Sequence, residues 1–149
     1  MHIVKRSIFD EIWAQIPKYS ITRQEQDSLR EEDGSLPIRR FTYTSDSGDV
    51  FDVTISPASI LFNDQEIDVY PAENEQYVEQ AINQIKAEVK GGMAGITAEA
   101  IHRRLLKSSR IMSVDAIIQS IEIMMQANMT IDHLDDEGKS VACLDRRFF

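Results

Sequence analysis

The stretch that decides the fold is "SRIMSVDAIIQSIEIMMQANMTIDHLDDEGKSVACLD", residues 109–145. Ser113 suits the N-cap of a helix, and the apolar residues after it recur at helical spacing. Two strand-like segments, "MTIDHL" and "SVACLD", then flank the turn "DDEGK", where Gly138 can adopt a positive φ. The sequence therefore predicts a helix that is followed directly by a tight hairpin.

A helix and hairpin in this order are typical of the recognition helix and wing of a winged-helix domain, which usually binds DNA. The helix here, from Ser113 to Asn128, contains no Lys or Arg, and its only charges are Asp115 and Glu122. Helices that read the major groove normally present Arg, Lys, Asn or Gln to bases and phosphates, and carboxylates repel phosphates. We therefore expect this helix to contact protein.

The helical spacing also predicts which side of this helix is buried. The residues expected to face the core are Val114, Ile117, Ile118, Ile121, Met124 and Met125. The residues expected to be exposed are Asp115, Gln119, Glu122, Ile123 and Gln126.

The rest of the chain divides into a strand-rich and a helix-rich part. A helix is predicted over residues 7–16, "TRQEQDSLREEDGSLP" reads as a loop or a frayed helix, and two hairpins form a small antiparallel sheet over residues 38–70. From Ala72 the spacing becomes helical, with Gly91-Gly92 as a stop and Thr97 as an N-cap. The prediction is an α+β protein with a small N-terminal helix-plus-antiparallel-sheet subdomain, residues 1–71, and a C-terminal winged helix-turn-helix domain, residues 72–149.

Composition and charge narrow the class of protein. The chain of 149 residues is 42% hydrophobic and carries a net charge of -9. Residues 1–90 hold 9 Lys and Arg against 17 Asp and Glu, whereas residues 91–149 hold 7 against 8. Affinity for nucleic acid comes mainly from Lys and Arg side chains that neutralise phosphates, so a chain this acidic can bind DNA only through a local basic patch. Its overall charge suits a basic protein partner better.

Location and membrane contact are predicted from the same composition. No apolar run is long enough to span a membrane, and the N-terminus does not read as a secretory signal. The only cysteine, Cys143, excludes an internal disulfide and fits a reducing cytoplasm or nucleus. It lies in a predicted strand, where we expect a buried thiol.

The C-terminal part resembles a known family. "IMSVDAIIQSIEIMMQANMTIDHLDDEGKSVACLD" is similar to the C-terminal winged helix of the replication protein A middle subunit, with an "MSV" cap and an acidic "DD" turn. "QAINQIKAEVKGGMAGITAEAIHRRLL" extends the resemblance upstream to cover roughly residues 76–145, and cullin winged helices are also similar. Both families use the winged helix to bind protein. Residues 1–75 are too poor in predicted strands for the OB-fold that precedes it in the replication subunit, and no modification lysine of the cullin type can be matched.

This resemblance, together with the acidic turn, predicts a binding surface for a basic protein or peptide. It consists of Asp132, Asp135, Asp136, Glu137, Glu122 and Ile123. The leading hypothesis is therefore a non-enzymatic protein-protein interaction module within a nucleic-acid-processing or regulatory assembly, of replication or transcription.

Direct DNA binding is the alternative, as in a replication initiator or transcription regulator. Its candidate residues form a basic group on the preceding helix and at the chain end: Arg103, Arg104, Lys107, Arg110, Arg146 and Arg147. The competing interpretation is a solvated helix face whose cations offset the helix dipole. The exposed hairpins also offer an edge for a homodimer.

Catalysis and metal binding have little support in the sequence, and an enzyme subunit is the remotest hypothesis. The three histidines, His2, His102 and His133, lie far apart, and no catalytic motif occurs. "GGMAG" at 91–95 lacks the Lys and Ser or Thr of a phosphate-binding loop. The acids around His133 match neither a zinc nor a calcium pattern, so no metal or other cofactor is expected.

Overall fold

A computed structural model describes residues 8–88 and 96–149, and it confirms the α+β class with 40% helix and 28% strand. The N-terminal elements are α1 (Ile8–Gln15), α2 (Arg23–Leu29), β1 (Arg39–Thr44), β2 (Val50–Ser56), β3 (Ala58–Phe62) and β4 (Gln65–Val69). The C-terminal elements are α3 (Glu73–Glu88), α4 (Ala98–Lys107), α5 (Val114–Gln126), β5 (Asn128–Leu134) and β6 (Ser140–Arg147). His2 and the glycines of "GGMAG" lie outside the described residues.

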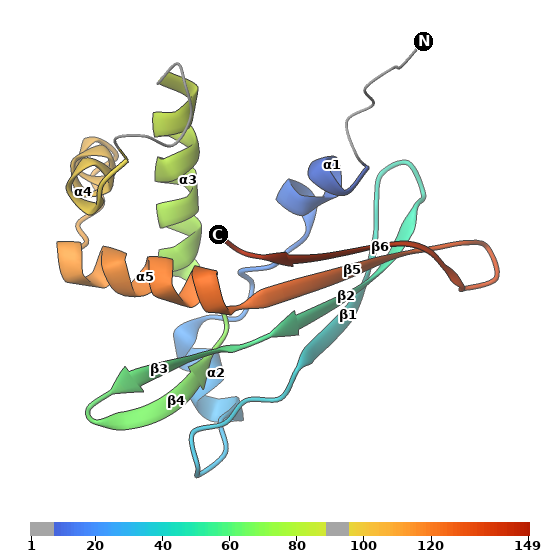
Figure 1. The fold of residues 1–149 in the computed structure, drawn as a ribbon, viewed down its shortest axis with the longest axis horizontal. Helices are drawn as coiled ribbons and strands as arrows, with labels where there is room; N and C mark the ends of the chain where they lie inside the picture. The colour runs from blue at the N-terminus through green and yellow to red at the C-terminus, as the bar shows by residue number, and fades with distance from the viewer. Residues whose placement is uncertain (1–7, 89–95) are drawn as a thin grey trace.

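The strands form two sheets, which corrects the prediction of one small sheet over residues 38–70. A four-stranded antiparallel sheet has the order β1-β2-β5-β6, and β3 and β4 form a separate two-stranded sheet. The β1–β2 hairpin pairs with β5, in a register that places Val50 opposite Leu134 (Figure 1). Turn residues predict each hairpin, but they carry no information about which hairpins meet.

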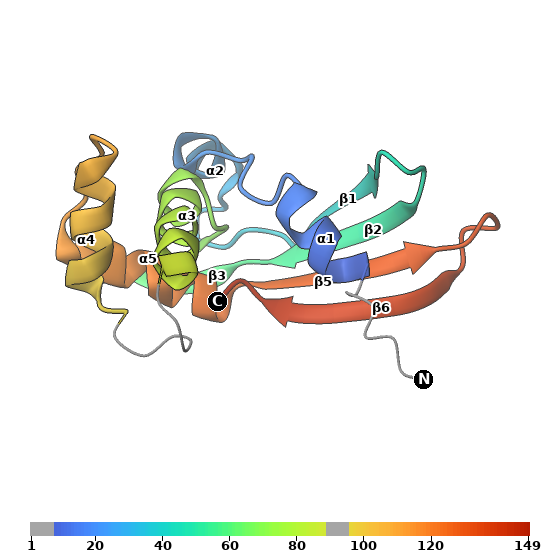
Figure 2. The same ribbon diagram turned by 90° about the horizontal axis from the view of Figure 1, so that it is seen from above.

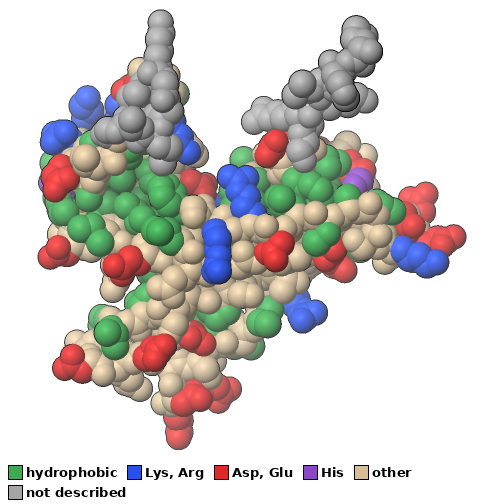
Figure 3. Space-filling view, viewed as in Figure 1, with side chains coloured by type: hydrophobic (Ala, Val, Ile, Leu, Met, Phe, Trp, Pro, Cys, Tyr) green, Lys and Arg blue, Asp and Glu red, His purple; other side chains and the backbone are tan. Residues whose placement is uncertain are grey.

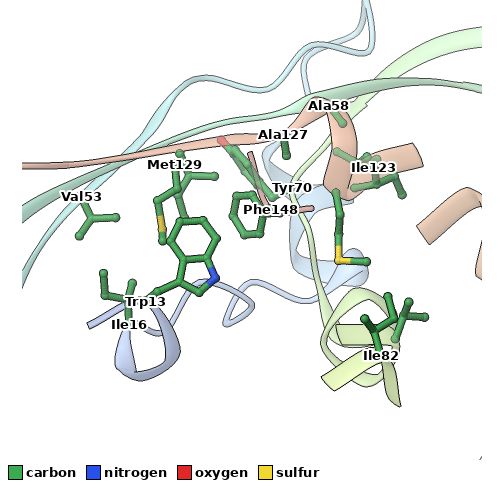
Figure 4. Packing of buried hydrophobic residues seen from close by; sticks show 14 of the residues in the cluster. Trp13, Ile16, Val53, Ala58, Tyr70, Ile82, Ile123, Ala127, Met129 and Phe148 are labelled. Atoms are coloured by element: carbon green, nitrogen blue, oxygen red, sulfur yellow. The ribbon is translucent and has the colours of Figure 1, made fainter. Parts of the chain in front are cut away.

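One face of the large sheet is covered by α1, which lies across it in Figure 2. The helix is amphipathic and buries Ile12 and Trp13. The Trp13 ring meets Phe148 edge to face, with ring centroids 5.8 Å apart, and Figure 4 shows it turned toward Met129. Burial of these apolar side chains is the main favourable contribution to packing α1 on the sheet.

The core contains residues from both predicted domains. Phe51 and Ile55 of β2 belong to the same buried cluster as Met124 of α5 and Ile131 of β5, and all four side chains are fully buried. The ranges 1–71 and 72–149 thus share one sheet and one core. The elements α3, α4, α5, β5 and β6 follow in the order of a winged helix, but β5 also pairs with β2.

The buried side of α5 differs from the one that its sequence predicts. Ile123, expected to be exposed, is 1% exposed and belongs to the core with Ala58 of β3 (Figure 4), whereas Ile118 and Met125, expected inside, are 44% and 55% exposed. The physical reason is that α5 contacts α3 and α4 and also β3. A helix that is packed on more than one side buries a wider set of positions than a single stripe.

The polar segment after α1, for which the sequence predicts a loop or a frayed helix, contains a regular helix, α2. Its N-cap Thr22 accepts a hydrogen bond from the Glu25 backbone N–H, and the Glu25 side chain accepts one from the Thr22 N–H. This reciprocal capping box is visible in the sequence as Thr-x-x-Glu. The fully buried Gln26 then bonds to the backbone of Tyr70 in both directions, at 3.0 and 2.9 Å, and fixes α2 against the end of β4.

Candidate protein-binding end of the sheet

The turn between β5 and β6 is the centre of the predicted binding surface. Asp135 closes it, because its carboxylate accepts the backbone N–H groups of Glu137 and Lys139, each at 2.9 Å. Asp136 and Glu137 are exposed. In the described part of the chain, the only ion pair of this turn joins Lys139 to Glu137 at 3.8 Å, and both side chains are exposed to solvent. Such an exposed pair has little energetic effect.

A second acidic turn lies at the same end of the sheet. Because Val50 pairs with Leu134, the turn before β2, which carries Asp46 and Asp49, lies next to the turn after β5. We call these five carboxylates, Asp46, Asp49, Asp135, Asp136 and Glu137, the acidic end. Figure 3 shows acidic side chains gathered where the sheet projects farthest from the helices. The sequence did not indicate Asp46 and Asp49, because their proximity depends on the β2–β5 register.

His133 connects the two turns. Its Nε2 lies 3.4 Å from Asp49 Oδ1, and its ring stacks on Phe51 with centroids 4.8 Å apart. Stacking on a fully buried aromatic ring holds the imidazole in place. The histidine thus ties the β5–β6 hairpin to the β1–β2 turn.

Asp132 lies on the outer face of the sheet, beside the acidic end. Its strand partners are Asp52 on β2 and Cys143 on β6, and its carboxylate accepts a hydrogen bond from Ser140 Oγ at 3.0 Å. With Arg40, it contributes to a hollow of about 340 Å³. Two carboxylates on neighbouring strands repel each other, and a cation bound between them would relieve this repulsion.

Cys143 is exposed, which corrects the expectation of a buried thiol. It lies on the solvent-facing side of β6, which is an edge strand of the four-stranded sheet within residues 8–88 and 96–149. Local desolvation raises the pKa of the thiol, and the nearby Asp132 and Asp145 raise it further. The thiol is therefore accessible but mostly protonated at neutral pH.

Glu122 and Ile123, the two predicted contacts on α5, lie outside the acidic end, and their side chains differ in exposure. Glu122 is exposed, whereas Ile123 lies in the core and has no free surface to offer a partner. Gln126 is also exposed, although its Oε1 accepts the Ser59 backbone N–H of β3 at 3.2 Å. The exposed surface of α5 therefore includes Glu122 but not Ile123.

Four of the six candidate DNA-contacting cations make side-chain contacts within the protein, and the six are divided between α4, the segment after it and the end of β6. Arg104 of α4 pairs through both terminal nitrogens with Glu88 of α3, and this hydrogen bonding lowers the pKa of Glu88. The Arg110 guanidinium lies 3.3 Å from the centroid of the Tyr77 ring. Arg103 and Lys107 are exposed on α4. The contacts of Arg104 and Arg110 favour a structural role for these two cations, whereas Arg103 and Lys107 stay available to a partner.

The two arginines at the end of β6 are also engaged. Arg146 lies over the Trp13 ring of α1, 4.5 Å from its centroid, and Arg147 donates a hydrogen bond to the carbonyl of Gln126. Both contacts hold the end of β6 against helices. Direct DNA binding by the six basic residues remains a prediction.

A buried ionic group near the start of α3 was missed by the sequence reasoning. Glu75 is 1% exposed, and its carboxylate accepts hydrogen bonds from Arg23 Nη2 at 2.7 Å, the Ala72 N–H at 2.9 Å and Ser120 Oγ at 2.8 Å. Burial raises the pKa of Glu75, although Arg23 and these donors oppose the shift. Its three partners come from α2, the start of α3 and α5, so no local pattern indicates the group.

The described residues contain neither a candidate metal site nor a membrane-spanning helix. Within residues 8–88 and 96–149, no group of three or more His, Cys, Asp or Glu side chains has a geometry that could hold a metal ion. None of the helices in these ranges has the length and apolar character needed to cross a bilayer.

Comparison of the chain with protein-family models, with curated proteins and with solved structures finds no match.

Proposed function

We propose that this protein is a non-enzymatic interaction module that binds a basic protein segment at the acidic end, within a nucleic-acid-processing or regulatory assembly. The observation that carries the proposal is the juxtaposition of two acidic turns by the β2–β5 register. The winged-helix order of α3 to β6 and the resemblance to protein-binding winged helices support the type of assembly. Five neighbouring carboxylates attract a cationic partner and raise its association rate.

A basic helix or extended segment suits this surface. The acidic end projects beyond the helices, so a partner can reach it without displacing an element (Figure 3). The adjacent Asp52 and Asp132 extend the negative surface along the outer face of the sheet. Lys and Arg on such a segment would form charge-assisted hydrogen bonds with these carboxylates.

Charge reversal at the tip of the hairpin tests the proposal. The probe is a fluorescein-labelled, Lys-rich amphipathic peptide, and binding is measured by fluorescence anisotropy at low and physiological salt. We expect Asp136→Lys with Glu137→Lys to weaken binding by about ten-fold or more, since close charge pairs at interfaces couple strongly. Asp135 is left unchanged because its carboxylate closes the turn.

The matched control makes the same change of charge elsewhere. Glu31→Lys with Glu32→Lys alters two exposed acids in the segment between α2 and β1, away from the acidic end. We expect it to change the affinity by less than about three-fold, through the general field alone. Equal losses in both variants would contradict a specific site, and tight, salt-sensitive binding of duplex DNA by the unmodified protein would favour the DNA alternative.

A further inference from the structure

A second concave site lies at the other end of the molecule from the acidic end. It is a cleft of about 400 Å³ that is lined by residues of α2, the β3–β4 hairpin, the start of α3 and α5. Figure 1 shows where these elements lie. This volume is within the range of small-molecule sites, roughly 300–1,000 Å³. The cleft shares no residue with the acidic end.

The hairpin side of the cleft is apolar. It is formed by Ile60, Phe62, Ile67 and Val69, with Ile60 directly opposite Ile67 in the β3–β4 register. Phe62 is 56% exposed at the end of β3, and Ile60 and Ile67 are half-buried. An aliphatic chain placed against these side chains would remove apolar surface from water on both sides.

The opposite side of the cleft is polar, and Arg23 is its distinctive group. Arg23 Nη2 is held by the buried Glu75, which Ser120 and the Ala72 N–H hold in turn. Arg23 Nη1 is buried and has no hydrogen-bond partner among the described residues, although the side chain as a whole is 32% exposed. A guanidinium left with a free donor favours a ligand oxygen that accepts hydrogen bonds.

The second arginine of the cleft is already occupied. Arg30 donates to the carbonyl of Asp68 from both Nε and Nη2, at 3.1 and 2.9 Å, and its Nη1 pairs with Asp27. It therefore supports the hairpin and is not the expected head-group contact. Arg23 Nη1 is a donor that lacks an acceptor in the described part of the chain. A carboxylate supplies oxygen acceptors and carries no competing donor.

We propose that this cleft binds an amphipathic carboxylate, with its aliphatic chain against Ile60, Phe62 and Ile67 and its carboxylate at Arg23. The ligand class is that of a medium-chain fatty acid. The site does not depend on the proposed function, because a molecule without an acidic end would keep the same cleft.

Binding is tested by titrating the full-length, ¹⁵N-labelled protein with sodium octanoate and following amide chemical shifts. We expect saturable shifts in α2 and the β3–β4 hairpin. Octanol, which has the same chain without the charge, should bind at least about ten-fold more weakly, because hydrogen bonds to charged groups are the stronger ones.

Variants separate the head-group and chain contacts. Arg23→Gln with Glu75→Gln replaces the ion pair by two amides, so no buried charge is left alone, and should weaken octanoate binding by about ten-fold. Phe62→Ser removes apolar surface at an exposed position and should weaken it several-fold. Arg39→Gln, which makes the same arginine replacement on β1 outside the cleft, should bind octanoate as the unmodified protein does.

Three results would overturn the proposal. Octanol could bind as well as octanoate, the shifts could spread over the molecule without saturating, or the Arg23→Gln, Glu75→Gln variant could keep full affinity. Thermal unfolding of each variant identifies loss of the fold. If the double variant unfolds, Phe62→Ser and octanol decide the question on their own.

Discussion

Lys18 is the most unusual single residue in the structure, because it is a cation that is 3% exposed. Its Nζ donates to the Trp13 carbonyl at 2.6 Å and lies 3.7 Å from Glu79 Oε1. Tyr19 donates to the other Glu79 oxygen at 2.5 Å. Burial lowers the pKa of Lys18, and Glu79 offsets only part of this shift. Lys18 is therefore a buried amine, and keeping it charged in the folded protein reduces the free energy of unfolding.

The lowered pKa predicts a pH dependence of stability. The folded protein binds the Lys18 proton more weakly than the unfolded chain, whose ordinary pKa is 10.5. Stability from this group is thus smallest where both states are protonated, and it rises as the pH rises from the folded pKa toward the unfolded pKa. Urea unfolding at pH values from about 7 to about 10 should show the unmodified protein gaining stability relative to Lys18→Met.

Lys86→Met is the control for that series, since Lys86 is an exposed lysine in the last turn of α3. Its difference from the unmodified protein should not change with pH over the same range. A constant difference for Lys18→Met as well would contradict the effect of burial on Lys18.

Cys143 gives a second prediction at the scale of one residue. The thiol is exposed, so 5,5′-dithiobis(2-nitrobenzoate) should modify it completely in the folded protein. Desolvation and Asp132 raise the thiol pKa, so the reaction should be slower than that of a free cysteine at the same pH. Asp132→Asn should accelerate it by about two- to five-fold, because less of the thiol is then held in the protonated form.

Glu32→Gln serves as the comparison for Asp132→Asn, because it also removes one carboxylate, at an exposed position in the segment between α2 and β1. It should not accelerate the reaction. No reaction in the folded protein, followed by reaction in urea, would show that the thiol is buried as its sequence pattern suggested.

At the scale of elements, α2 depends on a local signal that the sequence displays. Thr22→Ala removes the side-chain acceptor of the Glu25 N–H and should lower the free energy of unfolding by about 1 kcal/mol. Thr22→Ser keeps a hydroxyl and should restore most of the loss. Urea unfolding measures both, and an unchanged midpoint for Thr22→Ala would mean that Gln26 and Arg30 hold the helix without its cap.

Most elements could be predicted from the sequence, because their determinants are local. Caps, apolar spacing and turn residues indicated α1, α3, α4, α5 and the three hairpins. The side of α5 that is buried could not be predicted in full, since Ile123 is covered by contacts that depend on β3. The acidic turn after β5 was likewise predicted, whereas its neighbour at Asp46 and Asp49 depends on pairing between distant strands.

At the scale of the whole molecule, the sheet joins the two predicted domains. A fragment of residues 72–149 would lose β2, and with it the buried Phe51, Val53 and Ile55. Its β5 strand would have an unpaired, apolar edge, which promotes aggregation. We expect this fragment to lack a cooperative thermal transition and to elute as aggregates on size exclusion. A monomeric, cooperatively unfolding fragment would support the domain boundary near Ala72.

The pairing between β2 and β5 also has a consequence for folding during translation. Val50 pairs with Leu134, so the ribosome must translate the chain beyond Leu134 before this pairing becomes available. Until then the nascent β1–β2 hairpin has an open edge that includes Phe51, Val53 and Ile55. Long-range strand pairing of this kind is slow and exposes chains to misassembly. We therefore expect the nascent β1–β2 hairpin to be prone to misassembly during elongation, and slower translation would lengthen this period.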